Sequence, residues 1–280
     1  MINIEGLTGK KLVVCTPMYG ASCTGFYLQS MLMLASLCTS YGVRLRTVVL
    51  GDSLVTRARN RCVDVFKSLT DGEDDAPLMF IDADVQFNAA DVLKLMLMNK
   101  DMIGALYPLK QLNWKRVVNI LKREPSFAPE KLSKAACDYV FNFQIPPGEK
   151  NGKIDVSQPT LVRDIGTGFV MIRRKVFTAI EESGMAKTYG PCSNEEIFSG
   201  ERVFDHFPAG IDNELGVGED GVYLSEDWVF CRRWQKLGGE VYACPWIKLA
   251  HFGMMGFEGD LVALAESGAK IGEEFAQAEA

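Results

Sequence analysis

The sequence is poor in the residues that would indicate a metal cluster or a disulfide framework. Its 280 residues include only two histidines, and its eight cysteines are spread singly, with no C-x-x-C pair. Neither a zinc knuckle nor a set of disulfides is therefore predicted, and a reducing, intracellular setting is expected. The chain also lacks an excess of positive charge, since acidic residues outnumber basic ones and the formal net charge is -6. That balance disfavours nucleic-acid binding through bulk charge.

Long apolar runs are missing as well. Residues 1–11 contain no apolar run preceded by basic residues, so no secretory signal is predicted. The most apolar stretch, residues 28–38, is interrupted by Gln29, Ser30 and Ser36 and is too short to span a bilayer. We therefore expect a cytoplasmic protein without a transmembrane segment. Hydrophobic residues still make up 48% of the chain, which suffices for a sizeable core.

The first 110 residues alternate between two periodicities. Short apolar runs, typical of buried strands, are followed by stretches in which apolar residues recur at helical spacing. Strands are predicted at residues 11–16, 43–50, 78–81 and 102–106, and helices at 24–41, 54–69 and 89–98. This rhythm predicts an α/β fold with right-handed crossovers and a mostly parallel, Rossmann-like sheet. Ligands of such sheets bind beyond the carboxyl ends of the strands.

Beyond residue 110 the alternation weakens. Residues 114–156 carry several prolines and no clear period, which predicts an excursion from the domain rather than a linker. Order returns at residues 160–174, around Gly166 and Gly168. The remaining expectations are helices at 175–182 and 225–237, a strand at 240–243, a Gly- and acid-rich loop at 208–221 and a helical tail at 260–280. A single domain over residues 1–259 is the economical interpretation.

The sharpest local signal is a pair of carboxylates directly after a buried strand, in Phe80-Ile81-Asp82-Ala83-Asp84-Val85. Carboxylates in such a place are costly unless something solvates or pairs them. Residues two apart on an extended chain point to the same side, so Asp82 and Asp84 can face one ion. Their oxygen ligands suit Mg²⁺ or Mn²⁺, which also bridge nucleotide phosphates. A turn followed by a helix cap is the alternative, and the motif alone leaves both open.

Two later features carry side chains of the same kind. Ser225-Glu226-Asp227-Trp228 opens a predicted helix, where acids in the first turn also interact favourably with the helix dipole. His251 lies just past a strand and two residues before a glycine. A lone histidine is usually structural, yet this position also suits a metal ligand.

Taken in this order, the features resemble those of the fold-A (GT-A) nucleotide-sugar glycosyltransferases, particularly their family-2-like members. The resemblance extends from Lys11 to Gly253 and is weakest over residues 114–156. It implies a single GT-A-type domain with a nucleotide-binding half at about residues 1–110 and an acceptor half at about residues 150–259. It also implies Mn²⁺ or Mg²⁺ and a nucleotide-sugar donor, with a UDP-sugar as the first expectation.

The resemblance assigns roles to individual residues. Asp82 and Asp84 correspond to the Asp-x-Asp motif that holds the metal and the donor diphosphate, and His251 corresponds to a late histidine that completes the metal shell. Asp227 corresponds to a general base for the acceptor hydroxyl, with Glu226 as the neighbour that could replace it. The other donor-site candidates are Thr16, Pro17, Asp52, Arg57, Asn60, Ala83, Gly166 and Gly168. For Arg57 the alternative is an ion pair with a nearby aspartate, and for the two glycines it is ordinary turn chemistry.

Rival functions fit the residues less well. A phosphohydrolase with an aspartyl nucleophile places its Asp-x-Asp on the first strand and follows it with threonine, whereas here the motif follows the third strand and precedes Val85. A nucleotidyltransferase needs a Gly-rich, basic loop after the first strand, which residues 16–20 do not provide. A noncatalytic sugar- or nucleotide-binding protein and a retaining rather than an inverting transfer stay open. The acceptor (glycan, protein, lipid or modified nucleobase) and the oligomeric state are not specified.

Overall fold

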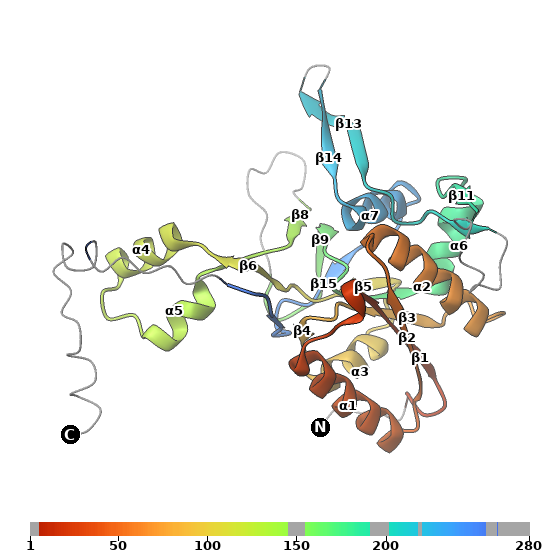
Figure 1. The fold of residues 1–280 in the computed structure, drawn as a ribbon, viewed down its shortest axis with the longest axis horizontal. Helices are drawn as coiled ribbons and strands as arrows, with labels where there is room; N and C mark the ends of the chain where they lie inside the picture. The colour runs from red at the N-terminus through yellow and green to blue at the C-terminus, as the bar shows by residue number, and fades with distance from the viewer. Residues whose placement is uncertain (1–5, 145–154, 191–201, 218–219, 256–261, 263–280) are drawn as a thin grey trace.

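The computed structural model describes residues 6–144, 155–190, 202–217, 220–255 and 262. Within them, an eight-stranded sheet lies between two layers of helices (Figure 1). Its strands are β1 (Lys11–Met18), β2 (Arg44–Gly51), β3 (Pro77–Ile81), β5 (Met102–Gly104), β8 (Phe141–Phe143), β9 (Thr160–Ile165), β10 (Phe169–Arg173) and β15 (Tyr242–Ala243). The covering helices are α1 (Gly25–Ser40), α2 (Val55–Leu69), α3 (Ala89–Leu97), α6 (Arg174–Glu182) and α7 (Glu226–Lys236).

Alternate residues of the central strands face opposite helix layers. Val13 and Cys15 of β1 join the core beneath α2, α6 and α7, whereas Leu12 and Val14 join the core beneath α1 and α3. All four side chains are buried. A strand that is covered on both faces carries a continuous apolar run instead of an alternating one. The run at residues 11–16 is therefore the sequence of a central strand.

The strand order in this sheet is β2-β1-β3-β10-β5-β15-β9-β8. Strands β2, β1 and β3 are parallel, as expected for the first half of the chain, and β15 is parallel to β5. Strand β10 runs antiparallel to both β3 and β5, and β9 runs antiparallel to β15 and β8. The α/β class and the single domain are confirmed, but the sheet is mixed. The antiparallel pairs all involve strands of the second half of the chain or β8.

Strands β9 and β10 are joined directly, without a helix between them. Their pairings show that they run in the same direction, and residues 166–168 connect them. The passage is tight: the backbone oxygen of Phe169 lies 2.5 Å from the position that a Cβ on Gly104 would occupy. The strand–helix boundaries expected from the sequence otherwise agree with these elements to within a few residues.

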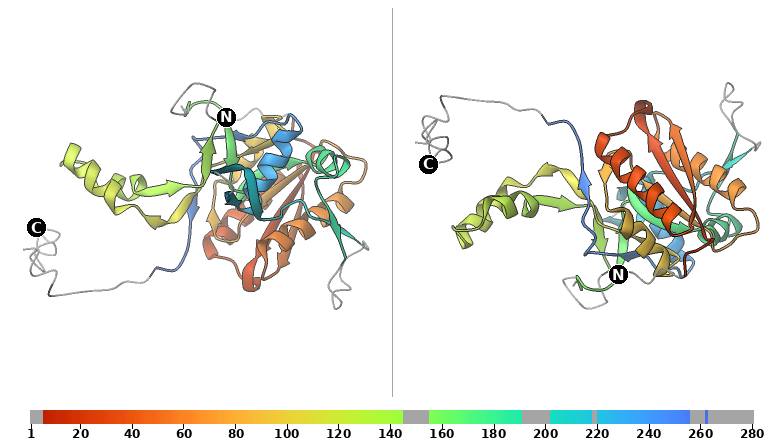
Figure 2. Two further views of the ribbon diagram at one scale, coloured as in Figure 1. Left: turned by 90° about the horizontal axis from the view of Figure 1, so that it is seen from above. Right: turned by 90° about the horizontal axis from the view of Figure 1, so that it is seen from below.

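Residues 108–139 form an arm that extends away from the rest of the molecule (Figures 1 and 2). The strands β6 (Pro108–Leu112) and β7 (Cys137–Tyr139) pair at its base, and the helices α4 (Trp114–Arg123) and α5 (Pro129–Ala135) lie beyond them. No residue of either helix is buried, and Trp114 is 63% exposed. The predicted excursion is therefore confirmed over its described residues, but it is helical. Asn113 caps α4 by accepting a hydrogen bond from the Arg116 backbone N–H.

The prediction of a loop at residues 208–221 is wrong, because most of this segment belongs to a β-hairpin. Strand β13 (Gly210–Val217) pairs with β14 (Asp220–Leu224), and Ile211 lies opposite Tyr223. The glycines and acidic residues of this segment obscure the alternation of apolar residues that is typical of a strand. Apolar residues such as Ile211 and Tyr223 nevertheless pair across the two strands. Two short pairings complete the described fold, that of β4 (Val85–Gln86) with β16 (Ala250–His251) and that of β11 (Thr188–Tyr189) with β12 (Val203–Phe204).

The remaining expectations concern the ends of the chain. The tail predicted at 260–280 lies outside the described residues, apart from Val262. In the described part of the chain, no helix has the length and apolarity needed to cross a membrane.

Candidate functional site

The carboxyl ends of β1, β2 and β3 meet at one edge of the sheet because these strands are parallel. A pocket of about 730 Å³ lies there. Its lining comes from the end of β1 and the segment 19–24 after it, the segment after β2 with the start of α2, the segment 82–84 after β3, one residue of β6 and the segment 251–254. Of the residues predicted from the sequence, it contains Pro17, Asp52, Asp82, Ala83, Asp84 and His251. We call this the donor pocket.

The structure brings Asp84 and His251 into contact. Strand β16 pairs with β4, which places His251 opposite Val85, the residue after Asp84. The Nε2 atom of His251 lies 3.2 Å from Oδ1 of Asp84, and the Lys110 ammonium donates to Oδ2 of the same carboxylate. Burial would raise the pKa of Asp84, but the hydrogen bonds from His251 and Lys110 outweigh it and lower the pKa to about 2. Asp84 is therefore ionised at neutral pH.

The hydrogen bond made by Nδ1 of His251 determines which role Nε2 can play in the contact with Asp84. A carbonyl oxygen can only accept, so Nδ1 of His251 donates to the oxygen of Pro108 over 2.9 Å. In a neutral ring Nε2 is then an acceptor, and it faces another acceptor, the Asp84 carboxylate. A proton or a metal cation shared by the two atoms resolves this opposition. Nε2 of His251 and Oδ1 of Asp84 can therefore share either a proton or a divalent cation.

Asp82 lies in the same pocket but has a different partner. Its Oδ1 accepts a hydrogen bond of 3.0 Å from Nη2 of Arg59, and its backbone N–H donates to the carbonyl of Gly168. In the described part of the chain, no three His, Cys, Asp or Glu side chains form a group that could hold a metal ion. The structure thus brings two of the three predicted ligands into contact, and the third, Asp82, lies in the same pocket with Arg59 as its partner.

Arg59 was not among the residues predicted from the sequence. It projects from α2, is only 3% exposed, and its Nε lies 3.6 Å from Oε1 of Glu226. Burial opposes its charge, but Asp82 and Glu226, together with Tyr107 and Asp227, raise its pKa further above its usual value. Arg59 therefore connects the Asp82 carboxylate with the acidic start of α7. The signal in the sequence was an arginine on the face of α2 that carries Ala58, Cys62 and Phe66.

Asp227 lies at the start of α7 and is buried, with 8% of its surface exposed. Burial raises its pKa to about 6, and the neighbouring Glu226 adds to the increase. The Ser225 hydroxyl and the Trp228 backbone N–H both donate to its Oδ1, which limits the shift. A carboxyl group with a pKa near neutrality is suited to accept a proton.

Three side chains at or next to these residues carry buried polar atoms that make no hydrogen bond in the described structure. They are Arg59 (Nε and Nη1), Thr167 (Oγ1) and Trp228 (Nε1). Buried donors are normally satisfied by protein or by water. Arg59 contacts Asp82, Thr167 precedes Gly168 and Trp228 follows Asp227, so these atoms lie close to the predicted site residues.

The other predicted residues lie near the donor pocket without lining it. The Thr16 hydroxyl is 2.6 Å from that of Tyr27, and Arg57 donates two hydrogen bonds to Asp52. The second contact is the ion pair that the sequence left open, and it holds the pKa of Asp52 below its usual range. Asn60 bonds to Asp205 and to the backbone of Phe207, so it fixes the segment before β13.

Gly166 and Gly168 lie against Tyr107. A Cβ on Gly166 would be 2.3 Å from the Tyr107 hydroxyl, and one on Gly168 would be 2.8 Å from Oδ2 of Asp82. The Tyr107 ring in turn packs edge-on against His251, with 5.2 Å between the ring centres. The absence of a Cβ at both positions therefore lets the chain pack closely against Tyr107 and Asp82, and the predicted contact of the two glycines with a donor stays a prediction.

Comparison with known proteins yields likenesses of structure alone. No protein-family model matches the chain, and no curated protein matches it. The crystal structure of A197 from STIV is 15% identical, with a TM-score of 0.46, over 87% of this chain and 86% of that one. A crystal structure of GalNAc-T7 with UDP, GalNAc and Mn²⁺ is 10% identical, with a TM-score of 0.38, over 90% of this chain and 45% of that one. The topology of the chain is that of a single α/β domain with a mixed central sheet.

Proposed function

We propose that this protein is a metal-dependent glycosyltransferase that moves a sugar from a nucleoside-diphosphate donor to an acceptor hydroxyl. The observation that carries the proposal is the contact between Asp84 and His251 inside a pocket that also contains Asp82 and Asp52. A cation shared by these two atoms, which lie 3.2 Å apart, would satisfy both, and a pocket of about 730 Å³ has room for a diphosphate beside it.

In this proposal Asp82, Asp84 and His251 hold Mn²⁺ or Mg²⁺. The bound ion would supply positive charge to the leaving diphosphate, a Lewis-acid role. Lys110 already lies on Asp84 and offers a second positive charge at the rim of the pocket. The nucleoside would lie over Pro17 and Asp52, at the ends of β1 and β2, so that residues 1–110 form the nucleotide-binding half. A UDP-sugar is the donor that we would test first.

Asp227 has the properties of the general base. The acceptor oxygen attacks the anomeric carbon, the bond from that carbon to the diphosphate breaks, and the acceptor proton passes to Asp227. Because the attack is direct, the anomeric centre inverts. Arg59 would act as a positioning residue, since it contacts both Asp82 and Glu226 and so couples the donor pocket to the base. Residues 150–259 would then form the acceptor half.

The test compares two variants that separate binding from transfer. Asp84→Ala should abolish metal-dependent binding of UDP, measured by calorimetry with and without Mn²⁺. Asp227→Asn should leave that binding unchanged but stop the slow hydrolysis of UDP-glucose, measured by chromatography of the products. Asp71→Asn, at a carboxylate that is 92% exposed, is the matched control. If both site variants hydrolyse the donor as fast as the wild type, the assignment is wrong.

A further inference from the structure

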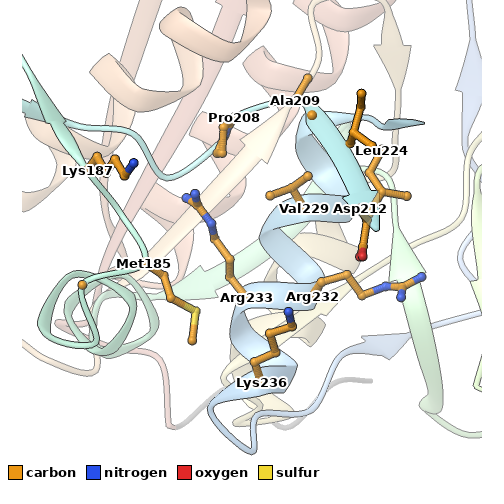
Figure 3. Close-up of a pocket in the computed structure, with 13 residues that line it drawn as sticks. Met185, Lys187, Pro208, Ala209, Asp212, Leu224, Val229, Arg232, Arg233 and Lys236 are labelled. Carbon is orange, nitrogen blue, oxygen red and sulfur yellow. The ribbon is translucent and has the colours of Figure 1, made fainter. Parts of the chain in front are cut away.

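A second pocket lies apart from the donor pocket, between α7, the end of α6 and the β13–β14 hairpin (Figure 3). Its volume is about 580 Å³. Among the described residues that line it, four are basic (Lys187, Arg232, Arg233 and Lys236) and one, Asp212, is acidic. This excess of positive charge occurs in a chain whose net charge is -6.

The two adjacent arginines have different partners. Arg232 donates from Nε and Nη2 to the buried carboxylate of Asp164, so its charge is matched within the protein. Arg233 donates from Nη1 to two backbone carbonyls, those of Asp205 at 2.6 Å and His206 at 3.3 Å. Burial lowers the pKa of Arg233, and the charge of Asp205 offsets part of that effect. A half-buried guanidinium held by neutral oxygens is suited to bind an anion.

The position of Lys187 shows that the dipole of α7 does not by itself account for the basic cluster. Basic residues in the last turn of a helix interact well with its dipole, and this accounts for Arg233 and Lys236 on α7. Lys187 comes from another element, since it lies directly before β11. Figure 3 shows the charged ends of Lys187 and Arg233 directed into the same part of the pocket, below Pro208, while Arg232 is directed the other way.

The pocket also has apolar walls. Met185, Pro208, Val229 and Leu224 line it together with the basic side chains. A ligand that fills this space therefore has an apolar or ring-shaped part as well as a negative group.

The pocket lies on the opposite face of α7 from the candidate base. At 100° per residue, Arg233 and Lys236 are rotated from Asp227 by roughly 240° and 180°. A ligand in this pocket would therefore contact the helix that carries Asp227 without entering the donor pocket.

We propose that this pocket binds a small organic phosphate, with the phosphate between Lys187 and Arg233 and the organic part against Met185, Val229 and Leu224. The site is separate from the donor pocket and needs no metal. It also does not depend on the proposed transfer reaction, because a protein that failed every glycosyltransferase assay would still bind the anion.

Calorimetry with the full chain in the presence of EDTA tests this site, since the chelator removes metal-dependent binding in the donor pocket. The probes are inorganic phosphate, glucose 6-phosphate and phenyl phosphate. Phenyl phosphate should bind more tightly than inorganic phosphate because of the apolar walls, and the glucose 6-phosphate titration distinguishes a sugar from an aromatic group. Lys187→Gln and Arg233→Gln should each weaken binding at least about tenfold, as expected for loss of a charge-assisted hydrogen bond.

Three controls make the result specific. Lys122→Gln removes an exposed lysine of α4, and Asp84→Asn alters the donor pocket, so both should leave binding unchanged. Arg233→Lys, which keeps the charge, should retain part of the affinity, and Lys187→Gln carries the test alone if Arg233→Gln does not fold. The proposal is overturned if no probe binds up to about 10 mM, if Lys122→Gln weakens binding as much as Lys187→Gln, or if only Asp84→Asn removes it.

Discussion

At the scale of single residues, the burial of Asp227 affects both its proposed role as a base and the stability of the folded protein. Its pKa rises from an ordinary 3.8 to about 6 because the side chain is buried. The folded protein therefore binds this proton more tightly than the unfolded chain does. The stability that comes from the protonated form is fully present below pH 4 and is lost as the pH rises through 6.

Asp227→Asn should accordingly stabilise the protein at pH 8, by on the order of 1–3 kcal/mol, because it removes a buried charge and keeps an oxygen for Ser225 and Trp228. The gain should fade as the pH falls from 6 to 4. Urea unfolding of both proteins from pH 4 to 8 measures it. A difference that does not change with pH would contradict the pKa that we assign to Asp227.

The same pKa predicts the pH dependence of the reaction. A base must be deprotonated to accept the acceptor proton, so donor hydrolysis by the wild type should fall about tenfold for each pH unit below 6. Asp84, with a pKa of about 2, stays ionised over pH 5.5–7, and rates are compared at Mn²⁺ and donor concentrations that saturate the site at each pH. Rates and calorimetry on the same samples separate a loss of rate from a loss of binding. Parallel losses of rate and binding would exclude Asp227 as the titrating group.

Arg59 is the residue whose loss should matter most for stability within the site. Arg59→Met removes the positive charge between Asp82 and Glu226, and we expect a loss of about 3 kcal/mol in the free energy of unfolding. Arg116→Met breaks an exposed ion pair with Asp138 in the arm and should cost less than about 1 kcal/mol. Urea titrations of the two variants make the comparison, and equal losses would show that Arg59 is not the link we infer.

At the scale of elements, the segment between β9 and β10 packs against Tyr107, which in turn contacts His251. Gly166→Ala would place a methyl group 2.3 Å from the Tyr107 hydroxyl, and Tyr107 packs on His251. We expect a loss of about 1–3 kcal/mol in stability and weaker Mn²⁺ binding. Gly25→Ala, where a Cβ meets nothing within 4 Å, is the control. Thermal unfolding and a Mn²⁺ titration measure both effects, and a Gly166→Ala protein that matches the control would refute the coupling.

At the scale of the whole molecule, the two halves of the chain share one sheet. Strand β10, from the second half, lies between β3 and β5 of the first half and pairs with both. The core residues Val170 and Ile172 of β10 belong to the same cluster as Val13 and Leu78. The nucleotide-binding half is therefore a functional proposal and not an independent folding unit.

A fragment of residues 1–110 should consequently fail to fold, because β3 and β5 would lose their common neighbour and the backbone partners that it provides. Circular dichroism and amide exchange of the fragment test this expectation, with the full chain unfolding in one cooperative transition as the reference. A protected, cooperatively unfolding fragment would show that the halves are separable.

The local elements of the fold follow from local patterns. The apolar runs and helical spacings before residue 110 predict β1, β2, β3, α1, α2 and α3, because periodicity is a property of neighbouring residues. The aspartate pair after a buried strand is a signal of the same kind. It identified Asp82 and Asp84 without knowledge of their partners, and the pocket contains both.

Other features depend on contacts between distant segments, and no local pattern predicts them. The insertion of β10 between β3 and β5 and the Arg59 bridge each join residues far apart in the chain. The partner of His251 is set in the same way, by pairing of β16 with β4. The sequence thus supplies the groups and their local geometry, whereas their partners are chosen by packing, because the free energy of burial is shared among segments that meet only in the folded state.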